Sequence, residues 1–332
     1  MAELVSLDEV QAAARRLRGV TVRTPLVPFP AARPANLLIK PESLQATGAF
    51  KLRGAYNAIA ALPEADRRRG VVAHSSGNHG YAVAYAAGLL GVRAAIVVPH
   101  NAPKVKTDAI EASGAELIRV EPTLAARVAG ARAVASTRGY SEIPPFDDRR
   151  VIAGQGTIGL EIAADCPARS PAAVLVPVSG GGLISGIAVA VKALRPGTRV
   201  IGVEPELAAD ARESFRSGTR VAWPASDVAR TAADALRVEQ VGELTFAHIR
   251  ELVDDIVTVT EEEMFAAVRQ LALRARLVAE PGGAVAVAAC MFRGQEELGA
   301  SGAPLVAVLS GGNIDPALLA RVLAPDAESY TE

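Results

Sequence analysis

Short apolar segments alternate with helical patterns along most of this sequence, and this alternation restricts the fold more than any other feature. The apolar segments 94–99, 116–120 and 173–178 are each followed by a stretch of helical periodicity that ends near a glycine or a proline. Strands that alternate with helices form a parallel sheet covered by helices on both faces. The sequence therefore predicts an α/β fold with parallel sheets flanked by helices.

Length and charge narrow the class of protein. The 332 residues are enough for two domains, each with its own core. A formal net charge of −1 gives no electrostatic footprint for nucleic acid or an anionic membrane surface. The start lacks the apolar core of a signal peptide, and the most apolar segment, 82–99, is interrupted by Arg93. We therefore expect a soluble cytoplasmic protein that binds neither nucleic acid nor membranes.

A polar, proline-bearing stretch at 141–150 separates two series of alternating elements. We expect a small domain of residues 70–147, inserted into a large domain made of 1–69 and 148–332. The expected helices lie at 7–17, 51–62, 80–90, 103–113 (capped by Asn101), 123–138, 155–165, 182–194 and 260–278, the last opened by a capping box of Thr260 and Glu263. Residues 217–247 show the least regular pattern and predict surface loops. Cys166 and Cys290 have neither metal nor redox spacing.

Lys51 stands at the beginning of a predicted helix, in the segment Thr47-Gly48-Ala49-Phe50-Lys51-Leu52-Arg53-Gly54-Ala55. The helix dipole disfavours a cation at this end. A lysine that works as a neutral amine or an imine gains from the same position, because a positive potential lowers its pKa. The alternative is an ordinary first-turn lysine that points into water.

Three further loops follow the same strand–loop–helix plan. In Ser179-Gly180-Gly181-Gly182 the glycines let the backbone approach a ligand, and the helix start suits a phosphate. The loop His74-Ser75-Ser76-Gly77-Asn78-His79-Gly80 places hydroxyls, an amide and an imidazole at a helix start, which suits a carboxylate. Ser310-Gly311-Gly312-Asn313 follows the last strand, and its serine either binds a ring nitrogen or caps the last helix.

A dinucleotide fold is the competing interpretation of the glycine loop. Gly180, Gly182 and Gly186 precede a helix, and Glu204 ends the next strand, where a ribose-binding acid would stand. The third glycine comes one place too late for G-x-G-x-x-G, because Ser185 holds that position. An NAD-dependent dehydrogenase therefore remains a distant alternative.

The four motifs together resemble those of the fold-type II pyridoxal-phosphate enzymes, whose fold is similar to the tryptophan synthase β subunit. Within that group the chain resembles the serine/threonine dehydratase (threonine ammonia-lyase) and serine racemase branch. The resemblance extends through the segments 151–157 and 251–256, nearly from end to end. It implies pyridoxal 5′-phosphate as cofactor, an amino acid as substrate and a homodimer.

The resemblance also implies roles for single residues. The cofactor-binding residues would be Lys51, which holds the cofactor covalently, Phe50 beside its ring, Asn78 at its 3′-oxygen, Ser179, Gly180, Gly181, Gly182 and Leu183 around its phosphate, and Ser310 at its pyridine nitrogen. The substrate side would comprise Ser75, Ser76, Asn78, His79 and Arg127. Mg²⁺ or Ca²⁺ would be bound by Glu204, the carbonyl of Ala208 and Asp210, a set of oxygen ligands that suits these cations. An acidic helix start would look similar.

The activity that the resemblance favours is dehydration of L-threonine or L-serine to the 2-oxo acid and ammonia, with Lys51 taking the Cα proton. Serine racemisation is an alternative, because the racemase branch also has a serine at the position of Ser76, where it serves as the acid. Dehydration of hydroxyaspartate or phenylserine stays open as well. Ala49 and Ala235 replace a serine and a glycine of the family, which leaves the preferred substrate open. Tyr81 replaces a glutamine of the nucleotide-activated racemases, so we expect no nucleotide activation.

Overall fold

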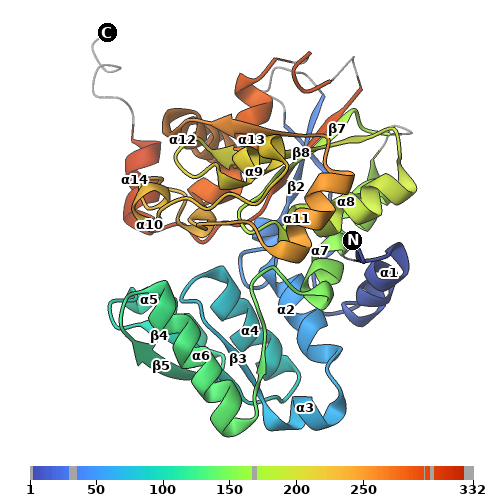
Figure 1. The fold of residues 1–332 in the computed structure, drawn as a ribbon. Coiled ribbons are helices and arrows are strands. Elements are labelled where there is room, and N and C mark those ends of the chain that lie inside the picture. The colour runs from blue at the N-terminus through green and yellow to red at the C-terminus, as the bar shows by residue number, and fades with distance from the viewer. Residues whose placement is uncertain (1–2, 30–35, 167–169, 295, 300–302, 325–332) are drawn as a thin grey trace.

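The computed structural model describes residues 3–29, 36–166, 170–294, 296–299 and 303–324. These residues form two lobes, each built around a parallel sheet (Figure 1). The fold is therefore α/β, with helices on both faces of each sheet.

The larger sheet has six strands in the order β1-β2-β10-β7-β8-β9. Their bounds are β1 (Val27–Pro28), β2 (Leu37–Pro41), β7 (Ala173–Pro177), β8 (Arg199–Pro205), β9 (Asp255–Val259) and β10 (Leu305–Leu309). All neighbouring pairs are parallel except β1 with β2. The strand nearest the C-terminus, β10, thus lies in the interior of the sheet, between β2 and β7.

The smaller sheet has four parallel strands in the order β5-β4-β3-β6. Their bounds are β3 (Val71–Ala73), β4 (Ala94–Pro99), β5 (Glu116–Val120) and β6 (Ser141–Glu142). All four come from one continuous stretch of the chain, whereas the six-stranded sheet is assembled from segments before and after it.

The α-helices are α1 (Leu7–Arg16), α2 (Lys51–Ala60), α3 (Glu64–Arg69), α4 (Asn78–Leu89), α5 (Lys104–Ala112), α6 (Leu124–Arg138), α7 (Arg149–Asp165), α8 (Gly182–Leu194), α9 (Asp210–Ser217), α10 (Ala225–Val228), α11 (Glu243–Leu252), α12 (Glu261–Gln270), α13 (Pro281–Phe292) and α14 (Pro316–Leu323). Short 3₁₀ turns, η1 (Glu42–Leu44) and η2 (Asp234–Leu236), and a π-helical turn, η3 (Leu271–Ala275), complete the elements.

Alternate residues of the large-sheet strands belong to two separate hydrophobic cores, one on each face, because successive side chains of a strand point to opposite faces. Leu175 and Ile201 pack with α12 and α13, while Val174 and Val176 pack with α7, α8 and α11. In the small lobe one core contains Val71 and Ile96 together with Leu52, Ala55 and Ile59 of α2. Helix α2 therefore packs against the small sheet although it precedes residue 70.

Most predicted elements are confirmed, and a few were wrong. The predicted helix at 155–165 begins earlier, at Arg149, because Asp148 caps it by accepting from the N–H groups of Arg150 and Val151. The stretch 141–150 therefore contains a strand and a helix start.

The bounds of other predicted helices also differ. Helix α5 is preceded by Pro103 at its N-cap, so Asn101 does not cap it. The capping box of Thr260 and Glu263 is present, but the regular helix ends at Gln270 and a π-helical turn follows. The region 217–247 also includes α10 and the start of α11.

Two further sequence inferences bear on the chemistry. Within the described ranges, no helix combines the length and the apolar character needed to cross a bilayer. Cys166 and Cys290 are both free thiols and buried, and burial raises the pKa of Cys290. Neither thiol is therefore poised to react.

Candidate active site

Lys51 is the first residue of α2, a helix whose N-cap, Phe50, provides no side-chain cap. Its Nζ donates to the carbonyl of Pro145 at 2.8 Å and lies 5.0 Å from the centre of the Phe50 ring. Desolvation lowers the pKa of Lys51 to about 8, although the Glu280 carboxylate acts in the opposite direction. The neutral form of this amine is therefore far more populated near pH 8 than that of an ordinary lysine, as a nucleophilic lysine requires.

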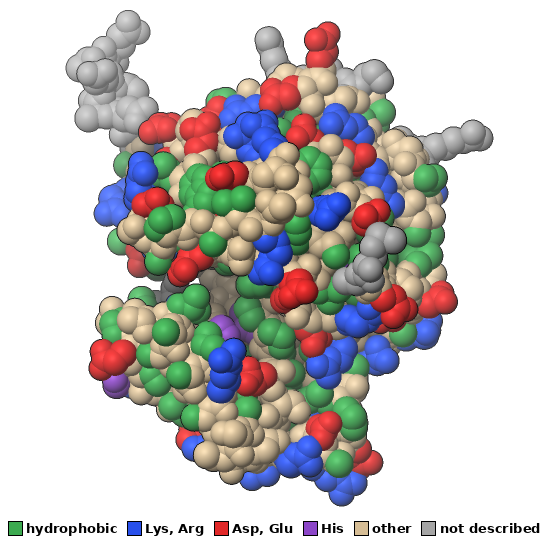
Figure 2. Space-filling view, viewed as in Figure 1, with side chains coloured by type: hydrophobic (Ala, Val, Ile, Leu, Met, Phe, Trp, Pro, Cys, Tyr) green, Lys and Arg blue, Asp and Glu red, His purple; other side chains and the backbone are tan. Residues whose placement is uncertain are grey.

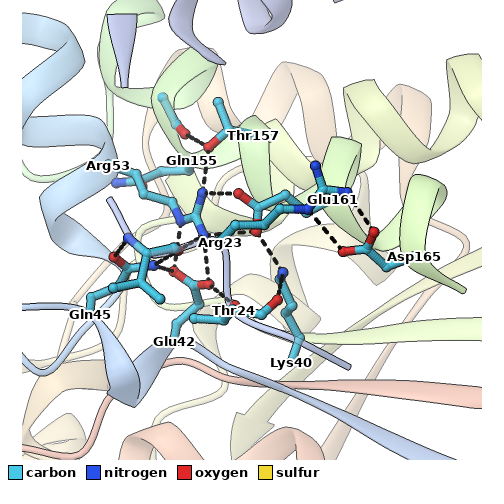
Figure 3. A network of polar contacts seen from close by, with 12 residues as sticks. Arg23, Thr24, Lys40, Glu42, Gln45, Arg53, Gln155, Thr157, Glu161 and Asp165 are labelled. Atoms are coloured by element: carbon cyan, nitrogen blue, oxygen red, sulfur yellow. Dashed lines mark hydrogen bonds and ion pairs between the residues drawn. The ribbon is translucent and has the colours of Figure 1, made fainter. Parts of the chain in front are cut away.

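A buried ionic cluster anchors the helix that carries Lys51 (Figure 3). Arg53 donates to both oxygens of Glu42, at 2.7 and 2.9 Å, and to both oxygens of Glu161, at 2.7 and 3.0 Å. Lys40 donates to Glu161 at 2.6 Å. We call Lys40, Glu42, Arg53 and Glu161 the arginine cluster. Because Lys51 and Arg53 are two residues apart in a helix, they point to roughly opposite sides, so the cluster fixes the helix from behind the amine.

The glycine loop between β7 and α8, residues 179–183, has the geometry of an anion-binding site, and we call it the phosphate cradle. Ser179 and Gly181 have positive φ angles of 55° and 91°, and helix α8 begins without a side-chain cap. A Cβ at Gly180 would lie 2.2 Å from the Phe146 ring, so only glycine fits there. Uncapped N–H groups at a helix start bind phosphate well. Residues 179–183 thus fit the phosphate that the sequence motif implies.

The segment between β6 and α7 connects the lysine with this loop. Pro145 accepts the hydrogen bond of Lys51, and the next residue, Phe146, packs against Gly180 and Gly182. Asp147 then accepts from the N–H groups of residues 243–245 and so caps α11. Three consecutive residues of this connection therefore contact the elements of the site.

Asn78 joins the two lobes. Its Nδ2 donates to Oε1 of Glu280 at 2.6 Å, and its Oδ1 accepts from Nδ2 of Asn313 at 2.8 Å. Asn313 also donates to the carbonyl of Thr47 at 2.9 Å. Asn78 belongs to α4 of the small lobe, whereas Glu280 and Asn313 belong to the large lobe. The amide group is thus held at the junction, where the surface is hollowed between the lobes (Figure 2).

Ser310 lies at the carboxyl end of β10, where its backbone contacts Phe50, the residue before Lys51. Its carbonyl accepts from the N–H of Phe50 at 3.0 Å, and its N–H donates to Gly283 at 3.3 Å. The residue is buried, and within the described chain its hydroxyl has no hydrogen-bond partner. A hydroxyl that no protein group engages can form a hydrogen bond with a ligand atom such as a ring nitrogen.

The loop after β3 supplies the start of helix α4, which has no side-chain cap. Ser75 accepts from the N–H of Gly77 at 3.2 Å, and Ser76 is half-buried. The His79 ring is buried, and its Nε2 lies 2.8 Å from the carbonyl of Ile143. Desolvation and the nearby Lys51 lower the pKa of His79 to about 3, so the ring is neutral and donates to Ile143. His79 can therefore attract a carboxylate through its backbone N–H and not through a ring charge.

Arg127 and His74 form a second polar feature of the small lobe. Arg127 is half-buried, and the desolvation that results lowers its pKa. It forms no ion pair with any residue of the described ranges, and its Nε lies 3.5 Å from its own helix at Thr123. The pKa of His74 is lowered by burial and by the charge of Arg127, and the Nδ1 of His74 is buried without a partner. These groups are open to an anionic ligand.

Glu204 and Asp210, which we call the acidic pair, are buried side by side at the end of β8 and the start of α9. Glu204 Oε2 accepts from the N–H of Arg212 at 2.8 Å, whereas Glu204 Oε1 and both carboxylate oxygens of Asp210 have no partner in the described chain. Burial and Asp210 raise the pKa of Glu204 well above its usual range, and burial raises the pKa of Asp210 to about 7. No group of three or more His, Cys, Asp or Glu side chains gathers around a metal position among the described residues. A cation here would rest on two carboxylates and backbone oxygen, a set that fits Mg²⁺ or Ca²⁺.

Comparison with known proteins identifies the family. The model of the family described as "Pyridoxal-phosphate dependent enzyme" matches residues 17–311. The chain belongs to this family. The dinucleotide interpretation of the glycine loop is therefore wrong, and the phosphate cradle belongs to a pyridoxal-phosphate enzyme fold.

Individual relatives of this pyridoxal-phosphate enzyme carry several activities. The chain is 40% identical to the L-threonine ammonia-lyase of Thermotoga maritima, over 96% of this chain and 78% of the relative. It is 41% identical to the L-threo-3-hydroxyaspartate ammonia-lyase of Saccharomyces cerevisiae, over 85% and 84%. The solved structure of maize serine racemase is 34% identical, with a TM-score of 0.90 and coverage of 96% of this chain and 97% of the racemase. The fold is therefore the fold-type II arrangement of these enzymes.

The sequence analysis missed several residues that contact the site of this pyridoxal-phosphate enzyme. Glu280, Pro145 and Phe146 carry no motif that marks them, because each acts through its position in a turn or at a helix start. Asn313 could have been found, since it ends the L-S-G-G-N motif, and its side chain reaches Asn78. The partners of Arg53 lie in segments far from it in sequence, and no local pattern predicts them.

Proposed function

We propose that this protein is an ammonia-lyase that uses pyridoxal phosphate to dehydrate L-threonine or L-serine to the 2-oxo acid and ammonia. The observation that carries the proposal is the amine of Lys51. Its pKa is lowered, and it donates to Pro145, which precedes the Phe146 ring that packs on the glycine loop. The threonine ammonia-lyase activity of the T. maritima relative supports the choice of reaction.

Each part of the cofactor would meet a residue suited to it. Residues 179–183 would bind the phosphate, Asn78 and Ser310 would orient the ring, and Phe50 would pack beside it. The bound cofactor supplies the electron sink for chemistry at Cα. The protein supplies orientation, charge and proton transfer.

The substrate side would use the start of α4. Ser75, Asn78 and the N–H groups of that helix would hold the substrate carboxylate. Lys51, once displaced from the cofactor, would take the Cα proton, for which a pKa near neutrality is favourable. The β-hydroxyl would then leave as water with a proton returned by the Lys51 ammonium, and hydrolysis of the released enamine would give the 2-oxo acid and ammonia.

Replacing the lysine tests this proposal. In Lys51→Ala we expect turnover of L-threonine to fall to background and the absorption band of lysine-bound cofactor to disappear, with the circular dichroism spectrum unchanged. Borohydride reduction and peptide mapping of the unaltered protein should label Lys51. Lys104→Ala, which removes an exposed lysine, is the matched control. Label on Lys40, Lys104 or Lys192 would refute the assignment.

A β-carboxylated substrate is a second candidate, and the pair of Arg127 and His74 favours it. A half-buried arginine without a carboxylate partner would bind the second carboxylate of 3-hydroxyaspartate, the substrate class named for the yeast relative. Arg127→Gln should then lower kcat/KM for 3-hydroxyaspartate at least tenfold more than that for L-serine. An equal loss for both substrates would assign Arg127 no part in selecting the side chain.

Racemisation depends on Ser76. A racemase needs an acid on the face of the substrate opposite Lys51, and we expect elimination to dominate, with D-serine a minor product. Ser76→Ala should then spare L-serine elimination while it removes D-serine formation. Chiral chromatography after incubation with L-serine checks both, and D-serine that outpaces pyruvate in the unaltered protein would make racemisation the main activity.

We further propose that Glu204, Asp210 and the carbonyl of Ala208 bind Mg²⁺ or Ca²⁺, because three buried carboxylate oxygens lack partners. Trp223 is the only tryptophan and donates to Glu213, which lies on the same short helix as Asp210. Titration of the chelated protein with Ca²⁺ should therefore change the tryptophan fluorescence and raise the melting temperature. If neither responds, the acidic pair is only an acidic helix start.

The remaining expectations concern organisation. We propose a domain of residues 70–147 inserted between 1–69 and 148–332, assembly as a homodimer and location in the cytoplasm. Sedimentation velocity tests the dimer, and a single species with the mass of one chain, 34.3 kDa, would refute it.

A further inference from the structure

A cavity of about 550 Å³ lies outside the candidate active site, between helix α1, the segment that follows it and helix α7. Arg53 and Glu161 of the arginine cluster line its inner part, and Arg15, Arg18 and Arg23 line it nearer the surface. Its volume falls in the range of about 300–1,000 Å³ typical of small-molecule sites. The charges of the lining residues determine which ligands this cavity could bind.

The negative groups near this cavity are already paired. Glu161 accepts from Lys40 and Arg53, and Arg23 forms an ion pair with Asp165 (Figure 3). The cluster and the Arg23–Asp165 pair are therefore each close to neutral and contribute no net negative charge.

Two positive charges at the cavity are not balanced. The side chains of Arg15 and Arg18 are exposed, and neither has an ion pair or a hydrogen bond with any other residue in the described part of the chain. Arg15 and Arg16 lie in the last turn of α1, where the helix dipole favours a cation. Arg18 lies beyond the helix, so the dipole gives it no such role. Unpaired guanidinium groups around a cavity are suited to phosphate or carboxylate oxygens.

Small side chains leave the room for a ligand. Ala14 of α1 and Ala164 of α7 both line the cavity, where larger residues would fill it. On α7, Glu161 and Ala164 are three residues apart and therefore share the face that looks into the cavity.

We propose that this cavity binds a small polyanion, a molecule with at least two phosphate or carboxylate groups, through Arg15 and Arg18. Because Arg53 lines the cavity and stands in helix α2, the bound anion would lie next to the cluster that anchors Lys51.

Calorimetric titration of the holoenzyme tests the proposal, with inorganic pyrophosphate and citrate as probes. The cofactor stays bound, so the phosphate cradle is filled and does not compete. At least one probe should bind once per chain, with an affinity that falls as NaCl is raised. In Arg15→Ala/Arg18→Ala the dissociation constant should rise at least tenfold. Binding of pyrophosphate alone would identify a phosphate ligand, and binding of citrate alone a polycarboxylate.

Two further variants make the result decisive. Arg119→Ala/Arg250→Ala removes two exposed arginines that have no side-chain partner in the described ranges, and should bind like the unaltered protein. Ala164→Phe keeps every charge and fills the cavity, and should abolish binding. If neither probe binds, if the Arg119/Arg250 control loses affinity equally, or if Ala164→Phe binds normally, the proposal is wrong.

Discussion

Two buried groups of charged residues, the arginine cluster and the acidic pair, differ in whether their polar atoms have partners. In the arginine cluster Arg53 makes hydrogen bonds to Glu42, Glu161, Thr157 and the carbonyl of Val22. The acidic pair leaves three carboxylate oxygens unpaired. The cluster is complete within the chain, whereas the pair is complete only with a proton or a cation. The comparison distinguishes buried charges that the chain itself neutralises from buried carboxylates that it leaves without partners.

The largest expected effect concerns the arginine cluster. Arg53→Met would leave Glu42 and Glu161 buried beside only Lys40, and breaking a buried ion pair in this way costs about 3–5 kcal/mol. Urea denaturation of the holoenzyme should show a loss of this size. A loss below about 1 kcal/mol would mean that the cluster contributes little to stability, and the contrast with the acidic pair would fail.

The two groups should respond to pH in opposite directions. The pKa of Asp210 is raised to about 7 from 3.8, so its favourable contribution is present below about pH 4 and is lost as the pH rises through 7. The pKa of Glu42 is lowered by Arg53, so its contribution is present at neutral pH and is lost only as the pH falls into the acid range. In a chelator, the free energy of unfolding should therefore fall on the order of 2–4 kcal/mol between pH 5 and pH 8. Asp210→Asn should flatten this slope, and an unchanged slope would contradict the assignment.

Neutralising a carboxylate should stabilise the acidic pair and destabilise the cluster. At pH 8 without divalent cations, Glu204→Gln should stabilise the protein by about 1–2 kcal/mol, because glutamine requires neither a proton held well above the ordinary pKa of a carboxyl nor a second buried charge beside Asp210. The same variant should lose the stabilisation by Ca²⁺. Glu42→Gln is the matched change in the cluster and should destabilise. Two changes of the same sign would show that the groups do not differ as described.

The smallest expected effect, at the exposed Arg23–Asp165 ion pair, tests whether burial decides how much a charge pair contributes to stability. Arg23 forms an ion pair with Asp165 next to the cluster, but 61% of its side chain is exposed. Exposed pairs contribute only about 0–1 kcal/mol. Arg23→Ala should therefore change the free energy of unfolding by less than 1 kcal/mol, and a loss similar to that of Arg53→Met would show that burial does not decide the difference.

The sequence predicts the elements and the candidate site loops better than it predicts the partners of single side chains. Lys51, the glycine loop and Ser310 follow strands, so local pattern is enough to single them out. His79 is predicted at a carboxylate site from its place in the motif, but the sequence does not reveal that its ring is buried against Ile143 and neutral, because burial depends on the tertiary fold. The start of α7 was missed because Asp148 caps it inside a stretch whose prolines resemble a linker. Arg53 and Glu161 meet only once α2 and α7 pack together.

The strand order also determines when this protein can finish folding during synthesis. Of the strands in the two sheets β10 is made last, yet it lies between β2 and β7 and is followed by Ser310, whose carbonyl accepts from the N–H of Phe50. The small sheet needs only strands from residues 71–142, which emerge from the ribosome early. The large sheet stays open along β2 until residue 309 has been added, so one side of the proposed cofactor site is exposed until then. The proposed cofactor site therefore becomes complete only after β10 has been made and has paired with β2 and β7.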